Sequence, residues 1–399
     1  MKRIGLLKNI VRDYSWGSYT AIPKLLGKKP PYQKPCAELW MGAHPSGSSI
    51  VKTGKGWESL YDLIREYPDQ ILGRTCSKKF GGELPFLFKI IAASKPLSIQ
   101  IHPNLSQARK GFKRENSQDI PVDSFLRNYR DENHKPELLC ALSSFEALCG
   151  FRKIKEILIL FKKACPETLI KTVNALDRKP DSSGLKGFMA NLMKTDANLK
   201  KKIISEAALN ARKFAYDEPA FQCVVRLIKT YPDDIGVLSP LYLNLVRLSP
   251  GQAIFLPAGL VHSYLEGTAL ELMAGSDNVI RGGLTQKHMD SVEFLKTAGF
   301  RSHKIKIIMP VKNRKEYLYR TSTGEFALSK IIVGSGSKYL SPKRRNAEII
   351  LCTEGRSIIT GPEGAGINLS PGKSVIIPAS VTIYSIDGKA TLYKAQTPL

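Results

Sequence analysis

The sequence has no cysteine spacing that would mark a disulfide framework or a structural zinc knot. Its 399 residues include seven cysteines, an odd number scattered from Cys36 to Cys352, and no Cys-x-x-Cys pair occurs. Disulfide-rich secreted domains and zinc ribbons are thereby excluded. Scattered thiols are typical of a reducing compartment, so we expect free cysteines and a cytoplasmic protein.

Long apolar runs are also missing. No stretch approaches the ~20 consecutive apolar residues that a membrane-spanning helix needs. The apolar run that follows Lys2 and Arg3 is too short for a secretory signal. We therefore expect no association with a membrane.

Acidic residues are scarce relative to basic ones. The chain has 60 Lys and Arg against 35 Asp and Glu, a net charge of +25. The basic residues are spread along the chain, and the densest groups, Lys200–Lys202 and Lys343–Arg345, are short. No zinc-finger spacing, basic leucine-zipper region or aromatic RNA-binding motif accompanies them, so we expect no nucleic-acid partner. A generally basic surface would still attract a small anionic substrate.

The periodicity of apolar residues changes twice along the chain. Residues 1–150 show short apolar strands separated by turn residues, with one helix expected near 57–67. From 151 to 232 the apolar spacing is helical, and the strand pattern returns after 236. A polar stretch over 311–317 has the composition of a linker before a last β-rich unit. The helices expected between 151 and 232 lie near 154–161, 185–192, 203–214 and 221–230.

The most informative motif is the segment 251–262. An apolar strand ends in Pro257-Ala258-Gly259, and His262 follows three positions after the glycine. Glycine permits the positive φ that a tight turn often needs, so the turn can direct the histidine into the next strand. The pattern Gly-x5-Pro-x-Gly-x2-His resembles the second motif of the cupin β-barrels.

Three further residues complete a candidate metal site. Gln100 and His102 alternate along one strand and therefore share a face. Glu137 follows Pro136 at the start of an apolar run, at the expected mouth of a strand. Together with His262 these residues offer one amide oxygen, one carboxylate and two imidazoles. Such mixed ligation suits a divalent zinc, iron or manganese ion.

The last unit repeats this turn without its ligand. Leu248–Gly251, an apolar run and Pro257-Ala258 match Leu369–Gly372, an apolar run and Pro378-Ala379, but Ile383 stands where the first copy has His262. We therefore expect a mainly β protein with an α-helical insert and two cupin (jelly-roll) barrels, the second without the metal site. The expected units are a catalytic cupin domain (1–150 with 233–317), a helical insert (151–232) and a degenerate cupin domain (318–399).

The chain also resembles the type I phosphomannose isomerases, a family of cupin enzymes. The resemblance runs in the family's order from near the start to about residue 290, whereas the final hundred residues match only in general character. The motifs that carry it are Tyr14–Gly17, Ala37–Pro45, Pro85–Pro103, Asn133–Glu137, Asp234–Pro240, Leu256–Tyr264 and Ala274–Arg281.

The resemblance implies a function and a set of site residues. It implies interconversion of mannose 6-phosphate and fructose 6-phosphate through a cis-enediol, with one zinc per chain. One departure is Gln286, where the family usually has proline before the lysine equivalent to Lys287. The implied zinc ligands are Gln100, His102, Glu137 and His262; Arg281 is the implied active-site arginine; and Lys135, Tyr264, Glu271, Asp277 and Lys287 are implied in or beside the substrate pocket.

The reaction needs a base, a cation at the developing oxygen charge and an anchor for the phosphate. Zinc, aided by Arg281, suits the second task because both stabilise negative oxygen without redox chemistry. Glu271 is the first candidate for the base and Lys135 the second. Lys287 or Arg281 would grip the phosphate. The partner is thus a small sugar phosphate, and we expect a monomer.

Two other classes of protein remain open from the sequence. A ferrous cupin oxygenase would more often show two histidines and a carboxylate with open positions, which Gln100 disfavours. A non-enzymatic double cupin that binds sugar or nucleic acid would not need an intact metal set.

Overall fold

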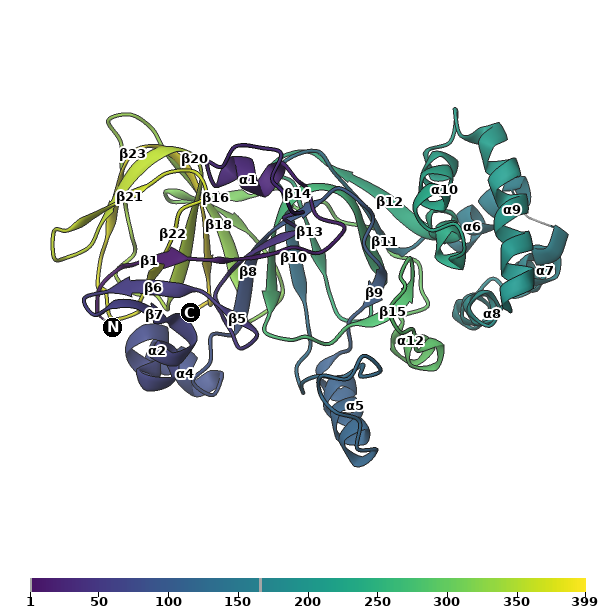
Figure 1. Ribbon diagram of the computed structural model, residues 1–399, viewed down its shortest axis with the longest axis horizontal. Coiled ribbons are helices and arrows are strands. Elements are labelled where there is room, and N and C mark those ends of the chain that lie inside the picture. Colours follow the sequence, from purple (N-terminus) through teal and green to yellow (C-terminus); the bar gives the residue numbers. More distant parts are fainter. Residues whose placement is uncertain (1, 165–166) are drawn as a thin grey trace.

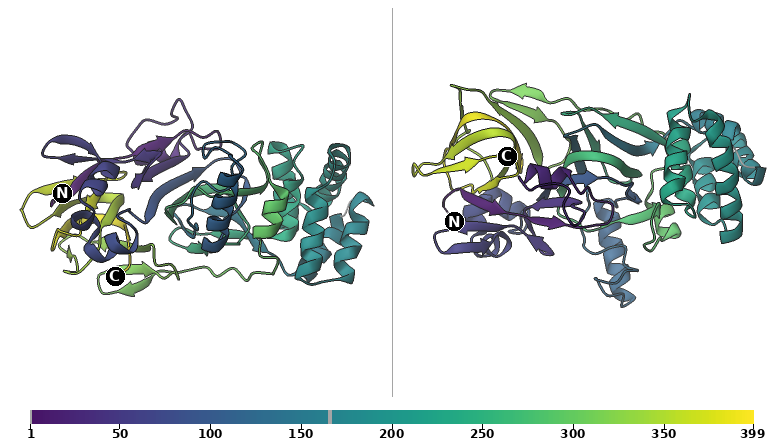
Figure 2. Two further views of the ribbon diagram at one scale, coloured as in Figure 1. Left: turned by 90° about the horizontal axis from the view of Figure 1, so that it is seen from below. Right: turned by 45° about the horizontal axis from the view of Figure 1, so that its top comes forward.

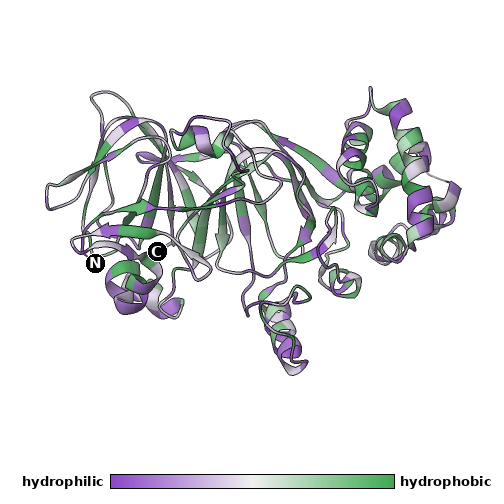
Figure 3. Cartoon of the chain, viewed as in Figure 1, coloured by the Kyte–Doolittle hydropathy of each residue, from purple (hydrophilic) through white to green (hydrophobic). Residues whose placement is uncertain are grey.

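The computed structural model describes residues 2–164 and 167–399. Two antiparallel sheets lie side by side in an elongated molecule, with a group of helices at one end and the C-terminal strands at the other (Figure 1). The views in Figure 2 keep the same order along the long axis. The fold is therefore β-rich with helices, and Figure 3 shows hydrophobic residues concentrated on the strands of both sheets.

The first sheet carries the candidate metal site. In the described part of the chain it has ten strands, of which β12-β11-β14-β8-β3-β2 form a continuous path. The other four, β9, β10, β13 and β15, pair around β14 or with one another. The strands are β2 (Ile10–Arg12), β3 (Glu38–Met41), β8 (Phe86–Ala93), β9 (Ile99–Ile101), β10 (Glu137–Ala141), β11 (Phe145–Phe151), β12 (Leu243–Leu248), β13 (Ala253–Leu256), β14 (His262–Ala274) and β15 (Ile280–Gly283).

The second sheet joins the two ends of the chain. Among the described residues it has eleven strands, ordered β16-β17-β18-β23-β20-β22-β1-β6-β7, with β19 on β23 and β21 on β20. N-terminal strands thus pair with C-terminal ones, which no local pattern predicts. The strands are β1 (Gly5–Lys8), β6 (Ile50–Thr53), β7 (Gly56–Ser59), β16 (Val311–Asn313), β17 (Glu316–Tyr319), β18 (Ala327–Val333), β19 (Lys338–Leu340), β20 (Glu348–Thr360), β21 (Gly366–Leu369), β22 (Ser374–Ile377) and β23 (Ser385–Gln396); β4 (Ala43–His44) and β5 (Gly47–Ser48) form a separate hairpin.

Both faces of the central strands are buried, each in a different core. In β8 all eight residues are buried. Ile91 faces a core inside the first sheet, whereas its neighbours Phe88 and Ile90 pack with Leu328 and Ile349 of the second sheet. Because side chains alternate along a strand, one face serves the site and the other joins the two sheets.

Helices occupy the segment between β11 and β12, where the sequence pattern predicts them. Its apolar stripes pack into one core that includes Phe161, Phe188 and Phe221. The structure adds α7, which the sequence analysis missed, and extends the third helix toward the N-terminus. The helices there are α6 (Ile154–Ala164), α7 (Ile170–Arg178), α8 (Ser182–Met193), α9 (Ala197–Phe214) and α10 (Pro219–Thr230), with a 3-10 turn at Glu167–Leu169.

The remaining helices are short or peripheral. The helix expected near 57–67 is α2, which buries Leu60, Leu63 and Ile64 on one side, and α5 extends away from the sheets (Figure 1). They are α1 (Ala21–Leu25), α2 (Leu60–Glu66), α3 (Pro68–Leu72), α4 (Arg74–Lys79), α5 (Leu105–Ser117), α11 (Ser239–Tyr242) and α12 (Ser291–Thr297), with a 3-10 turn at Ile235–Leu238.

The expectation of a linker over 311–317 is wrong. This stretch forms β16 and the start of β17, a hairpin at the edge of the second sheet. Arg314 takes a left-handed φ of 55° in its turn, and every residue of β16 is exposed. An edge strand tolerates such polar, solvated residues, so its composition resembles that of a linker.

The strand registers place residues of the two sheets at matching positions. Glu137 pairs with Leu256, the residue before Pro257, and Glu348 pairs with Ile377, the residue before Pro378. Two positions further on, Leu139 pairs with Glu271 and Ile350 pairs with Lys394. Glu348 therefore occupies the position of Glu137, and Lys394 that of Glu271.

The second copy fills its interior with internal cations. Lys394 Nζ lies 2.6 Å from Glu316 Oε1 and 3.2 Å from Glu348 Oε1. Arg345 adds a second cation 3.7 Å from Glu348, and Tyr384 donates to the same carboxylate at 2.8 Å. These ion pairs are almost completely buried.

Removing the central lysine should unfold this unit more easily. Lys394→Ala leaves the buried Glu348 and the partly buried Glu316 without their shared cation, and we expect a loss of about 3–5 kcal/mol in the free energy of unfolding. Urea denaturation measures it. Lys389→Ala, on the exposed part of the same strand, is the matched control. A Lys394→Ala protein as stable as that control would show that the cluster contributes nothing.

Candidate metal centre

Strand ends bring the predicted ligands together. Gln100 lies within β9, with His102 directly after it, while Glu137 opens β10 and His262 opens β14. The turn before β14 takes the predicted form, since Gly259 has a φ of 78°. The N–H of Gly259 donates to the carbonyl of His102 at 2.9 Å, so this turn is tied to the other histidine.

Glu137 lies between the two histidines. Its Oε1 is 3.3 Å from His102 Nε2, and its Oε2 is 3.5 Å from His262 Nε2. All three side chains are at most 3% exposed. Among the described residues they form the one cluster of His, Cys, Asp or Glu whose ligand atoms all lie within 4.8 Å of one another.

Hydrogen bonds determine which nitrogen of each histidine ring carries the hydrogen and which presents a lone pair to the Glu137 carboxylate. His102 Nδ1 lies 2.7 Å from the Asn278 carbonyl, and His262 Nδ1 lies 3.0 Å from the Leu260 carbonyl. A carbonyl only accepts, so in the neutral rings each Nδ1 carries the hydrogen and each Nε2 presents a lone pair. Burial lowers the pKa of His262 to about 4, which keeps that ring neutral.

The arrangement fits a divalent cation. Two imidazole lone pairs and a carboxylate converge in a buried space, and His102 Nε2 has no hydrogen-bond partner. Without a cation, the two lone pairs and the carboxylate charge would repel one another. Their burial away from water would also remain uncompensated. Gln100 donates its amide nitrogen to Ser98 Oγ at 3.1 Å, which leaves its carboxamide oxygen available as a ligand. A cavity of about 60 Å³, lined by Gln100, Glu137 and His262, provides room for an ion.

A chain of buried charges continues from Glu137. Tyr264 OH is 3.1 Å from Glu137 Oε2 and 2.9 Å from Glu271 Oε1. Lys89 Nζ lies 3.2 Å from Glu271 and 3.6 Å from Glu38. Lys135 Nζ lies 3.3 Å from Glu137 Oε1.

This chain separates the pKa values of the two glutamates. Burial and the neighbouring Glu137 raise the pKa of Glu271 to about 7. Burial also opposes ionisation of Glu137, but the positive charges of His102, in its protonated form, and of Lys135 outweigh burial and hold the pKa of Glu137 well below the usual range. Two carboxyl groups on one face are thus suited to different tasks, one as a permanent anion and one that exchanges a proton near neutrality.

Arg281 lies on the same face as the ligands. Gln100 pairs with His262 on one side and with Arg281 on the other, and directly opposed residues share a face. Burial and the neighbouring Arg130 lower the pKa of Arg281, and burial together with Arg281 lowers that of Lys287. In the described part of the chain none of these three cations has an ion-pair partner.

Two of the predicted substrate residues lie outside the small cavity. Lys287 is on an exposed loop. Asp277 lines a neighbouring cavity of about 340 Å³ with His44 and Arg130. Burial raises the pKa of Asp277, but the hydrogen bond and the charge of His44, together with Lys135 and Lys89, outweigh burial, so the net pKa is lowered. His134 lies 2.8 Å from Glu325 rather than in the cavity. The roles of all these residues stay predictions.

Sequence reasoning missed the buried pair Lys89 and Glu38. Lys89 is 6% exposed in the middle of an apolar strand, where a charged residue needs a buried partner. That position was a usable signal. Nothing local identifies Glu38 as its partner, because the contact depends on the pairing of β3 with β8.

The structure can be compared with two expectations from the sequence, one about the cysteines and one about membrane-spanning helices. The six cysteines that it describes are free, and Cys165 lies outside the described residues. Within the same residues, no helix has the length and apolar character required to cross a membrane.

These residues define a buried mononuclear metal centre on an antiparallel sheet. Comparisons with known proteins show the family of the whole chain. Residues 4–154 match the family model for the catalytic domain of type I phosphomannose isomerase. The chain is 37% identical over 398 residues to mannose-6-phosphate isomerase of Escherichia coli K12, covering 98% of this chain and 99% of the relative. The human mannose-6-phosphate isomerase is 33% identical over 393 residues, covering 90% and 89%.

Solved structures agree along the whole chain. A zinc-bound crystal structure of mannose 6-phosphate isomerase matches with a TM-score of 0.91 and 36% identity, covering 99% of this chain and 100% of that one. A mutant phosphomannose isomerase from Salmonella typhimurium matches with a TM-score of 0.92, the same identity and the same coverage. The chain belongs to the type I phosphomannose isomerase family.

Loss of one imidazole should weaken zinc binding. His262→Ala removes a ligand from the triad, and we expect no zinc to remain after dialysis, whereas the wild-type protein retains one equivalent. Elemental analysis and calorimetric titration measure this. His134→Ala, which removes a neighbouring histidine outside the cavity, should retain zinc. Equal zinc content in the two variants would contradict the ligand assignment.

Proposed function

We propose that this chain is a zinc-dependent mannose-6-phosphate isomerase that interconverts D-mannose 6-phosphate and D-fructose 6-phosphate through a cis-enediol. The observation that carries the proposal is the convergence of His102, Glu137 and His262 on one buried point. The full-length similarity to mannose-6-phosphate isomerases supports the choice of substrate and disfavours the oxygenase and binding-module alternatives.

One zinc is held by Gln100, His102, Glu137 and His262. When bound, zinc supplies a Lewis acid that stabilises negative charge on a substrate oxygen without redox chemistry. Lys135 and Glu137 lie in contact, so the lysine places a second positive charge beside this position. The walls around these residues are buried, which strengthens each electrostatic interaction.

Arg281 and Lys287 bind the anionic parts of the substrate. Arg281 shares the ligand face through its pairing with Gln100, so its guanidinium can donate to the oxygen on which charge develops. Lys287 grips the phosphate from the exposed loop. Neither cation has an ion-pair partner among the described residues, which favours an anion between them. Tyr264 and Asp277 border the sugar.

Glu271 is the proposed base that moves the proton between C2 and C1. Its pKa of about 7 suits a group that must take and return a proton near neutral pH. Tyr264 and Lys89 hold its two oxygens at 2.9 and 3.2 Å. Lys135 is the alternative base, because it also lines the cavity.

The two sheets form two cupin barrels, of which the second has lost its metal site. Supporting this are the matching registers of Glu137 and Glu348 and a separate apolar interior in each sheet. The proposed units are 1–150 with 233–317, the helical insert 151–232, and 318–399. Strands β1, β6 and β7 extend the last unit's sheet across this division.

We further propose a monomeric enzyme of the cytoplasm whose partner is a small sugar phosphate, with neither nucleic acid nor membrane as a partner. The free cysteines support a reducing compartment. The basic residues are spread along the sequence rather than gathered in an arm.

A coupled assay tests the function directly. We expect the purified protein to convert mannose 6-phosphate to fructose 6-phosphate, a chelator to abolish the activity, and added zinc to restore it. Coupling the fructose 6-phosphate that forms to a second enzymatic step with an optical readout provides the rate in real time. Full activity after verified removal of all metal would exclude the proposed mechanism.

Replacement of Glu271 tests the base. Glu271→Gln keeps the size of the side chain but cannot accept the proton, and we expect kcat to fall by about 10²–10⁴-fold. In the wild-type enzyme, the ionised base is lost as pH falls through about 7, so kcat/KM should decline on that acidic side. Steady-state kinetics across pH measure both effects.

Glu38→Gln is the matched control for that experiment. Glu38 is the other carboxylate paired with Lys89, and its loss should leave the acidic limb of the pH profile in place. If Glu271→Gln retained kcat within a few-fold of wild type, the proton transfer would belong to Lys135 instead.

A further inference from the structure

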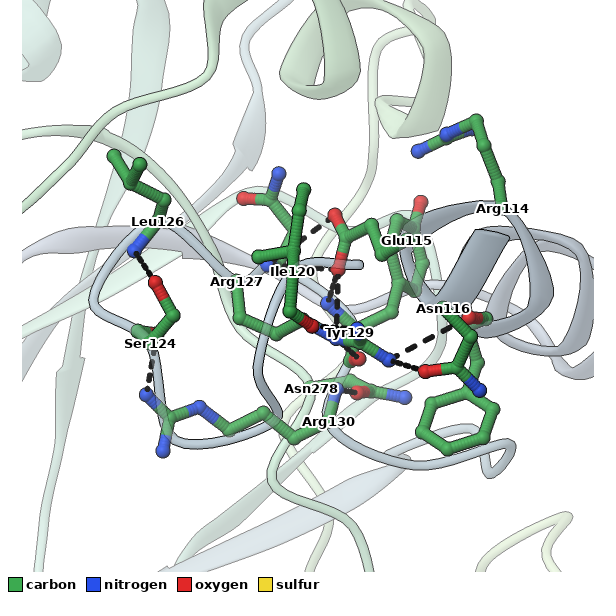
Figure 4. A network of polar contacts seen from close by, with 12 residues as sticks. Arg114, Glu115, Asn116, Ile120, Ser124, Leu126, Arg127, Tyr129, Arg130 and Asn278 are labelled. Atoms are coloured by element: carbon green, nitrogen blue, oxygen red, sulfur yellow. Dashed lines mark hydrogen bonds and ion pairs between the residues drawn. The ribbon is translucent and has the colours of Figure 1, made fainter. Parts of the chain in front are cut away.

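Two side chains hold four consecutive backbone amides beside the site. The carboxylate of Glu115, in α5, accepts from the N–H groups of Asn128 and Tyr129, the latter at 2.9 Å. The carboxamide oxygen of Asn278 accepts from the N–H of Arg130 at 2.7 Å (Figure 4). It also accepts from the N–H of Asp131 at 3.2 Å. The loop before β10 is therefore fixed by side chains rather than by strand pairing.

Glu115 is itself held by a buried arginine. Arg127 Nε lies 3.2 Å from Glu115 Oε2 and donates to the Tyr129 carbonyl at 2.6 Å, as Figure 4 shows. This part of the network contacts no predicted metal ligand. It provides a fixed support on one side of the loop.

Asn278 completes its hydrogen bonds with the same loop. It is fully buried, and its Nδ2 donates to the carbonyls of Asp131 and Asn133, each at 2.9 Å. The Asp131 carboxylate in turn accepts from Ser276 Oγ at 2.8 Å and from the N–H of Asp277 at 2.7 Å. Residues 130–133 and 276–278 are thereby joined in both directions.

The backbone of Asn278 contacts the metal centre. Its carbonyl accepts from His102 Nδ1 at 2.7 Å, the bond that turns His102 Nε2 toward Glu137. The loop that its side chain holds continues directly into Lys135 and Glu137. One residue thus contacts a ligand ring through its main chain and the segment bearing another ligand through its side chain.

We propose that Asn278 is a positioning residue that couples the orientation of His102 to the loop carrying Arg130, Lys135 and Glu137. The proposal rests on the proposed function for its kinetic consequences, but its structural content concerns the zinc ligands alone. Partners that orient metal-bound histidines typically affect metal affinity or activity by about 10- to 100-fold.

Truncation of Asn278 would leave several polar groups without partners. In Asn278→Ala, the amides of Arg130 and Asp131 and the carbonyls of Asp131 and Asn133 lose their bonds to the carboxamide. Leaving partly buried polar groups unpaired is costly, so the loop moves to regain partners. The carbonyl of residue 278 then shifts from His102, and Lys135 shifts relative to Glu137.

The experiment measures zinc affinity and kinetics separately. Zinc dissociation constants come from competition with a chelating dye, and kcat and KM are measured at zinc concentrations that saturate each protein. We expect Asn278→Ala to bind zinc about 10- to 100-fold more weakly and to retain a lowered kcat when saturated. Asn278→Asp keeps the acceptor oxygen but loses both N–H donors, and we expect the same two effects from it. If Asn278→Ala does not fold, Asn278→Asp takes its place in the experiment.

Asn346→Ala is the matched control. Asn346 is also buried, and its amide donates to the carbonyls of Thr397 and Pro398, in the second sheet's unit. It should lower thermal stability without changing zinc affinity. The proposal would be overturned if the folded Asn278 variants bound zinc within twofold of the wild-type affinity. It would also be overturned if Asn346→Ala lost as much zinc affinity as they do. A wild-type protein that binds zinc but lacks isomerase activity would instead refute the proposed function and leave the affinity comparison intact.

Discussion

The structure depends on three lone-pair-bearing groups that converge where water is excluded. Glu137 cannot lie within 3.5 Å of two unprotonated imidazole nitrogens in a buried space unless a positive charge offsets the repulsion. Lys135 offsets part of it from one side. The carbonyls of Asn278 and Leu260 prevent the alternative in which the rings turn and donate to the carboxylate themselves. The fold therefore favours a bound cation at this point.

The second sheet also places cations beside a buried carboxylate, but these cations belong to the chain itself. Glu348 lies at the position equivalent to Glu137, but the chain itself supplies the cations, Lys394 and Arg345. An internal ammonium cannot exchange or open a coordination position, so this copy gains a filled interior and no site. The proposed repeat would thereby divide its tasks, with chemistry in one sheet and support in the other.

The sequence predicted those parts of the site that local geometry determines. A Pro-x-Gly turn places His262 at the start of a strand, and strand alternation places Gln100 beside His102, independently of the rest of the chain. Long-range pairing has no such signature. The joining of β1 to β22, the contact of Glu38 with Lys89 and the edge hairpin over 311–319 arise from registers between distant segments, and solvated edge strands have the composition of linkers.

The two halves of the site differ in how they are built. The metal ligands lie on or next to strands, where register fixes their spacing, whereas Arg130 and Lys287 lie on loops. A site that must hold an ion constantly gains from rigid strands, while one that admits and releases a sugar phosphate needs segments that can adjust. Loops can serve that purpose only if their backbone is held, which is what Glu115 and Asn278 do by capturing four successive amides. Under the proposed function, Arg281, Arg130 and Lys287, which have no ion-pair partner among the described residues, would meet an approaching anion without first breaking an ion pair.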